Sequence, residues 1–121
     1  ASELVGAAEA KLRGQPVDPA IFARAAAGLR NQPGGDTIDT VILACTHFPL
    51  IQEELAAVFA PSTTFIDGAS GIARRIAVLT QGQPFRRAQG DFALFTKDQA
   101  DLSDLLPALA AHGLARIEIL A

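Results

Sequence analysis

The sequence lacks methionine and contains a single cysteine, Cys45, among its 121 residues. Because the chain has no methionine, we expect that it does not begin at a natural start and that it is part of a longer polypeptide. The 24 alanines favour helices but leave many side chains too small to fill a core, which supports the same expectation. One cysteine cannot form an internal disulfide bond, which is typical of the reducing cytoplasm, so we predict a cytoplasmic protein.

The sequence also lacks a basic stripe and a long apolar run. Ten basic and 13 acidic side chains give a net charge of −3, which argues against a nucleic-acid partner. No apolar run approaches the roughly 20 residues that a membrane-spanning helix needs. The first ten residues carry two glutamates and no basic side chain, unlike a signal peptide. Because 50% of the residues are hydrophobic and 19% are charged, the composition argues against disorder.

Helical and strand-like patterns alternate along the chain. Apolar side chains at helical spacing predict helices over 2–11 and from Pro19 to Leu29, the second capped by Asp18. The β-branched run 40–44 then predicts a strand buried on both faces, as in a parallel sheet. Further elements are expected as helices over 49–59, 70–79 and 103–112, strands over 63–66, 91–95 and 114–120, and a polar connector over 81–90. This order predicts an α/β fold with about five helices and four parallel strands.

Cys45 is the main candidate for chemistry, because it follows the predicted strand and precedes a helix that begins near Pro49. Ligands of open α/β sheets bind beyond the carboxyl ends of the strands, and helix N-termini favour anions such as carboxylates. His47, two residues on, would share a side with Cys45 in an extended chain and could exchange protons with its thiol. The alternatives are an inert core cysteine and an ordinary polar histidine.

Residues 39–50, with the sequence Asp-Thr-Val-Ile-Leu-Ala-Cys-Thr-His-Phe-Pro-Leu, resemble the second cysteine motif of glutamate racemases. The likeness spans residues 2–80 and continues more weakly beyond them. It includes segments 4–12, 53–55, 65–68 and 72–75. The sequence departs from the family pattern at Ala44, where glycine is common, and at 67–69, where Asp-Gly-Ala replaces Asp-Ser-Gly.

The resemblance implies a racemase that interconverts L- and D-glutamate for peptidoglycan synthesis, with no cofactor and no metal. In the family, one thiolate removes the α-proton and a second thiol delivers a proton from the opposite face. Cys45 matches the second cysteine, which acts on the L-enantiomer, and His47 matches the histidine that assists it. Thr46 matches a substrate-contacting threonine. Glu9 lines up with an acidic residue near the other cysteine, so we expect it to bind substrate; a solvated helix carboxylate is the alternative.

The resemblance also implies that the site lies between two α/β lobes, each of which supplies one cysteine. The first cysteine motif and the family's N-terminal Asp-Ser-Gly loop are absent, so the chain resembles a C-terminal half. We expect an incomplete, three-layer, parallel-sheet lobe, in which 1–68 belong to the second lobe and 69–121 return to the first. The isolated chain should be inactive and expose apolar surface. Its expected partners are glutamate, the missing N-terminal lobe and a second copy of itself, with no membrane.

Two other functions fit the same residues. One is a racemase of the same superfamily that acts on aspartate or another amino acid, although His47 argues against it. The other is a racemase-like module that binds a partner without catalysis, which the missing first cysteine would favour. For Asp67 we expect a helix-capping role, and for Arg74 and Arg75 a solvated helix face.

Overall fold

Five α-helices and four short strands make up the part of the chain that the computed structural model describes, residues 2–84, 86 and 89–120. Their order and type match the sequence-based prediction. Of the connector predicted over 81–90, residues 85 and 87–88 lie outside the described part. The helices are α1 (Ser2–Leu12), α2 (Ala20–Arg30), α3 (Gln52–Val58), α4 (Ala69–Leu79) and α5 (Leu106–Ala111), and the strands are β1 (Thr40–Ile42), β2 (Thr64–Ile66), β3 (Ala93–Phe95) and β4 (Ile117–Ile119).

The strands form two separate parallel pairs. β1 pairs with β2, with Val41 opposite Phe65, and β3 pairs with β4, with Leu94 opposite Glu118. A parallel pair needs a crossover connection, and α3 supplies it in the first pair and α5 in the second. The α/β class and the parallel pairing are therefore confirmed.

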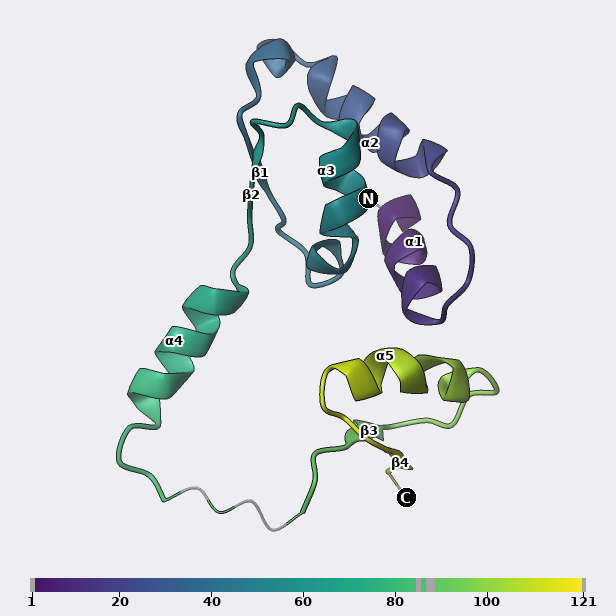
Figure 1. Cartoon of the computed structure of the whole chain (residues 1–121), viewed down its shortest axis with the longest axis vertical. Coiled ribbons are helices and arrows are strands. Elements are labelled where there is room, and N and C mark those ends of the chain that lie inside the picture. The colour runs from purple at the N-terminus through teal and green to yellow at the C-terminus, as the bar shows by residue number, and fades with distance from the viewer. Residues whose placement is uncertain (1, 85, 87–88, 121) are drawn as a thin grey trace.

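The main core lies between the first strand pair and helices α1, α2 and α3, which gather on one side of it (Figure 1). Val41 of β1, Phe65 of β2 and Leu43, which directly follows β1, pack in this core. Ala8 of α1 and Ile51, which directly precedes α3, are completely buried. The small alanine side chain lets α1 approach the segment after β1 closely. This packing places the C-terminal half of α1 next to the predicted functional segment.

The opposite face of the first strand pair is open among the described residues. Ile42 is 70% exposed and Ile66 is 49% exposed, so the strand expected to be buried on both faces is buried on one. Strand side chains alternate between the two faces, and α1–α3 cover only the face that Val41 and Leu43 share. Helix α4 has no buried residue and extends away from the other helices (Figure 1). Its exposed apolar side chains are Ile72, Ile76, Val78 and Leu79.

The helix termini follow the local sequence. Asp18 Oδ1 accepts a hydrogen bond from the N–H of Ala20 at 2.9 Å, and Asp67 Oδ1 accepts one from the N–H of Ala69 at 2.8 Å. Both carboxylates thereby cap the helix that follows, as expected for Asp67. Gly113, just past α5, has a φ of +84°, the left-handed conformation that glycine adopts after a helix.

Two predicted helices begin differently from expectation. The segment from Pro49 starts as a 3₁₀ turn over Phe48–Ile51, and the regular helix begins only at Gln52. Similarly, Leu102–Leu105 form a 3₁₀ turn before α5. Pro107 lies in the first turn of α5, where its missing N–H costs no helical hydrogen bond. Across the described residues, none of the helices combines the length and apolar character that crossing a bilayer requires.

The buried position of Ile51 leads to a stability prediction. Ile51→Ala should lower the free energy of unfolding by about 2–5 kcal/mol, because it leaves a cavity in the core of α1–α3. Ile72→Ala makes the same change on α4, where the side chain is 63% exposed, and should alter stability by no more than about 0.5 kcal/mol. Urea unfolding followed by circular dichroism measures both. Equal losses in the two variants would contradict this description of the core.

Candidate functional site

The predicted functional segment is the turn that connects β1 to α3. After Ile42 the chain leaves the strand, and the N–H of Phe48 donates a hydrogen bond to the Cys45 carbonyl oxygen at 3.1 Å. The 3₁₀ turn that follows begins at Phe48, so Cys45, Thr46 and His47 form the bend between strand and helix. Leu43 on one side and Ile51 on the other are buried and fix both ends of this bend in the core.

Cys45 and His47 lie together, as predicted, although the bend and not a continued strand brings them there. The distance between Cys45 Sγ and His47 Nδ1 is 3.7 Å, within hydrogen-bonding range for sulfur. Both side chains are partly buried. In the tautomer with its proton on Nε2, the imidazole accepts the thiol proton at Nδ1. A proton can therefore pass between this thiol and this ring without a further group.

Glu9 of α1 lies on the far side of the imidazole. Its Oε1 is 3.5 Å from His47 Nε2, so thiol, imidazole and carboxylate follow one another in a line. The sequence singled out Glu9 for substrate binding, and the structure brings it to His47. Sequence spacing gave no signal for this contact, because it depends on how α1 packs against the turn after β1. A carboxylate at this position can orient the ring through its contact with Nε2.

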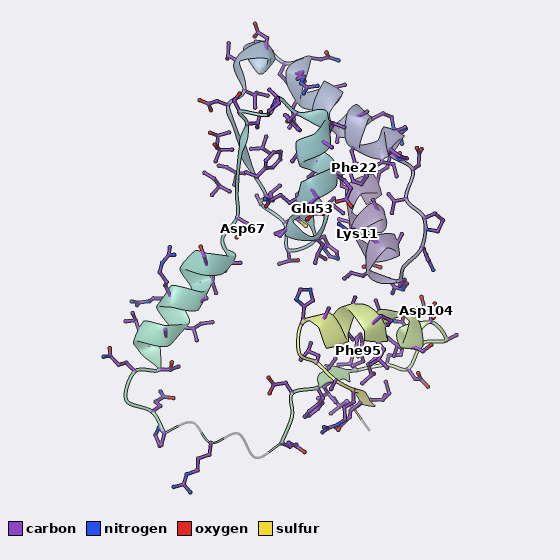
Figure 2. The ribbon with its side chains drawn as sticks, viewed as in Figure 1. Lys11, Phe22, Glu53, Asp67, Phe95 and Asp104 are labelled. Carbon is purple, nitrogen blue, oxygen red and sulfur yellow. The ribbon has the colours of Figure 1, made fainter. Side chains whose placement is uncertain are left out.

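An open cavity of about 460 Å³ lies in front of the thiol. Cys45, Thr46 and Pro49 line it from the bend after β1, and Asp67 and Ile72 line it from the other side. Figure 2 shows Asp67 where β2 passes into α4. The surface that lines the cavity is mostly apolar. The cavity lies at the carboxyl ends of the two parallel strands, the usual place for a ligand in such sheets.

The site residues divide into two groups by their relation to this cavity. Cys45 and Thr46 line the cavity, whereas His47 and Glu9 are not among its lining residues. Arg74 and Arg75, expected on a solvated helix face, are both exposed. No group of three or more His, Cys, Asp or Glu side chains is arranged to hold a metal ion in the described part of the chain.

A salt bridge holds α1 in place beside the site. Lys11 Nζ lies 2.7 Å from Glu54 Oε1 and donates a hydrogen bond to Glu54 Oε2 at 2.9 Å, which joins α1 to α3. Partial burial alone would raise the pKa of Glu54. Its hydrogen bonds with Lys11 and with its own backbone, together with the charge of Lys11, lower the pKa below the ordinary value of 4.5. The ionised carboxylate is therefore the form that the folded chain favours.

The Lys11–Glu54 pair should make stability depend on pH. Because the pKa of Glu54 is lower in the folded state, its stabilisation is present above the ordinary value of 4.5 and is lost as the pH falls through the folded value. Lys11→Met should therefore lower the free energy of unfolding by about 0.2–1 kcal/mol at neutral pH and by almost nothing in acid. Urea unfolding at several pH values measures the difference.

Lys97→Met is the control for this measurement, because it removes the same charge from an exposed site with no recorded ion pair in the described part of the chain. The salt bridge would have no such role if Lys11→Met and Lys97→Met lowered the free energy of unfolding equally, or if the loss in Lys11→Met persisted unchanged in acid.

Comparison with known proteins finds similar glutamate racemases. Glutamate racemase of Sphingopyxis alaskensis is 53% identical over 116 residues, which are 95% of this chain and 43% of that protein. Glutamate racemase of Klebsiella pneumoniae is 40% identical over 120 residues, or 97% of this chain and 41% of that protein. No protein-family model matches the sequence. The chain spans about two fifths of the length of these curated relatives.

A solved structure shows the same similarity in three dimensions. The crystal structure of Escherichia coli glutamate racemase, in complex with L-glutamate and the activator UDP-MurNAc-Ala, matches with a TM-score of 0.86 and 35% identity. The match covers 100% of this chain and 46% of that one. It includes residues beyond 80, where the sequence resemblance was weaker. The resemblance drawn from the Cys-Thr-His-Phe-Pro segment is thus confirmed by sequence and by fold.

Proposed function

Because this chain is homologous to glutamate racemases over almost its whole length, we propose that it supplies one half of the active site of such an enzyme. The reaction is the interconversion of L- and D-glutamate by proton transfer at the α-carbon. The observation that carries the proposal is the Cys45–His47 pair at 3.7 Å, beside an open cavity at the ends of two parallel strands. The names of the relatives support glutamate as the substrate.

In this proposal Cys45 is the acid–base group on one face of the substrate. As a thiolate it removes the α-proton of L-glutamate, and as a thiol it returns a proton to the carbanion formed from D-glutamate. His47 takes up and returns the thiol proton through Nδ1, which lies 3.7 Å from Cys45 Sγ. Thr46, which faces the cavity, is the polar side chain placed to contact the substrate.

Glu9 acts through His47 in this mechanism. When the imidazole carries a second proton, its charge lies 3.5 Å from Glu9 Oε1 and is stabilised by that carboxylate. Direct contact between Glu9 and substrate, the role expected from the sequence, stays a prediction. The position of Glu9 outside the cavity lining favours the action on His47.

One cysteine cannot serve both faces of the α-carbon, because inversion requires a proton donor opposite the base. The remaining length of the relatives, more than half of each, would supply the second thiol. We place residues 1–68 in the lobe that carries the Cys-Thr-His motif and residues 69–121 in a segment that returns to the other lobe. The two separate parallel strand pairs, β1–β2 and β3–β4, support this division. A cytoplasmic location and a role in peptidoglycan synthesis belong to the same proposal.

The unpartnered surface of the chain fits a half of this kind. Ile42 and Ile66 on the open strand face, together with the apolar side chains of α4, are surfaces that another lobe or a second copy of the chain would cover. A non-catalytic binding module would use the same surface. The two proposed functions differ in one respect: only the half of a racemase would need the Cys45 thiol for turnover.

A chimera tests the function. The matching segment of the Sphingopyxis alaskensis racemase is replaced by this chain, and racemisation of L- and D-glutamate is followed by circular dichroism. The unaltered chimera should racemise both enantiomers. Cys45→Ser should lower the rate roughly 10²–10⁴-fold in both directions, the range of a lost general acid–base group. The Klebsiella pneumoniae racemase serves as a second host if the first chimera is insoluble.

The two histidines provide a matched control in the same chimera. His47→Asn should lower kcat strongly, whereas His112→Asn, just past α5 and exposed, should leave the rate near that of the parent. A folded chimera without turnover would favour the binding module, and substantial turnover by Cys45→Ser would refute the role of the thiol. Turnover of aspartate in preference to glutamate would show that aspartate is the substrate.

The open apolar surfaces predict self-association of the isolated chain. Its average mass in sedimentation equilibrium should rise with concentration, and Ile72→Lys with Ile76→Lys on α4 should reduce that rise. Arg74→Ala is the control, because it changes the same helix at a charged, exposed position. A single monomeric species at high concentration would contradict the prediction.

A further inference from the structure

The series of contacts from the Cys45 thiol through the His47 imidazole to the Glu9 carboxylate continues to Arg13. Glu9 directs Oε1 to His47 and Oε2 to Arg13, whose Nη1 lies 3.3 Å away. Arg13, just past the end of α1, places its Nε 2.9 Å from Asp101 Oδ2. Asp101 directly precedes the 3₁₀ turn Leu102–Leu105, in the unit that contains β3, α5 and β4, and Figure 1 shows this unit next to the C-terminal end of α1.

We propose that Arg13 is a positioning residue, which holds Glu9 against His47 and links this contact through Asp101 to the β3–α5–β4 unit. The inference rests on the proposed function, because it assigns Arg13 to the environment of the same thiol. Arg13 would act only through Glu9, since neither it nor Asp101 lines the cavity in front of Cys45.

Burial indicates which member of the network fixes the others. The Arg13 side chain is 15% exposed, whereas those of Glu9 and Asp101 are 49% and 47% exposed. A half-exposed glutamate on a helix would sample several rotamers, and a single contact at 3.5 Å to a neutral ring does little to select one. The guanidinium presents donors in a fixed plane, so Arg13 can bind both carboxylates at once. It therefore restricts Glu9 to the rotamer that reaches His47.

The other charged side chains of α1 have separate partners. Lys11 on α1 pairs with Glu54 on α3. Glu3 on α1 pairs with Arg24 on α2 at 3.3 Å. Among the described residues, Glu9 of α1 is thus the charged side chain with a recorded contact to His47, and Arg13, just past α1, joins this contact through Glu9. The sequence gave no sign of this link, because Arg13 and Asp101 lie far apart along the chain.

The reactivity of the single cysteine measures the network without any substrate. The 121-residue chain is alkylated with iodoacetamide at neutral pH, and the rate at Cys45 is followed by mass spectrometry. Glu9→Gln should slow alkylation about two- to fivefold, because the imidazolium that accompanies the thiolate loses its carboxylate. In the Arg13→Gln background, the same Glu9→Gln change should have no further effect, since Glu9 is no longer held at His47.

Arg24→Gln is the matched control, because it removes the same charge and a salt bridge to the same helix. In that background the effect of Glu9→Gln should be unchanged. If Arg13 had a purely structural role, the alkylation rate of Cys45 would still depend on Glu9 in the Arg13→Gln chain. Equal slowing by Glu9→Gln in the unaltered chain and in the Arg13→Gln chain therefore overturns the proposal. The absence of any effect of Glu9→Gln in the unaltered chain also overturns it.

Asp101→Asn provides a second background if Arg13→Gln disturbs the fold, which far-UV circular dichroism monitors. It keeps Arg13 but weakens its anchor, and it should reduce the effect of Glu9→Gln in the same direction. An undiminished effect there overturns the link to the β3–α5–β4 unit. Because alkylation needs no glutamate, this result is independent of whether the chimera racemises.

Discussion

The close packing of α1 against the turn after β1 is the interaction on which the rest of the site depends. Ala8 of α1 and Ile51 of the turn are completely buried, and the small alanine side chain allows the approach. The Lys11–Glu54 salt bridge fixes the same helix at the edge of this contact. Close-packed interiors transmit such constraints to their neighbours. The carboxylate of Glu9 consequently reaches an imidazole that lies far from it in the sequence.

This arrangement separates the substrate side of the thiol from its proton-handling side. Cys45 lines a cavity at the carboxyl ends of β1 and β2, whereas His47, which contacts the thiol, and Glu9, which contacts His47, lie outside that lining. In the proposed reaction, the substrate can enter and leave while the imidazole and the carboxylate keep their positions. The cavity is open, and Ile72 of its lining is 63% exposed, which agrees with one half of a site that another lobe completes.

The local patterns predicted most of the elements, because each depends on neighbouring residues. Asp18 before Pro19 and Asp67 before α4 marked helix starts, and the β-branched run after Asp39 marked β1. The Cys45–His47 pair was predictable for the same reason. The exposure of Ile42 and the contact of Glu9 with His47 were not, since both depend on which distant segments cover which surface. The sequence of β1 is typical of a strand buried on both faces, yet the described residues cover only one of them.

The most direct test of the central claim is exchange of the α-proton of glutamate in heavy water. The isolated 121-residue chain is incubated with L-glutamate and, separately, with D-glutamate, and loss of the α-proton signal is followed by NMR. The account predicts no exchange above the uncatalysed background with either enantiomer, because one thiol and an open cavity do not make a complete site. Exchange with interconversion of both enantiomers would contradict it, because the chain would then form a complete site alone.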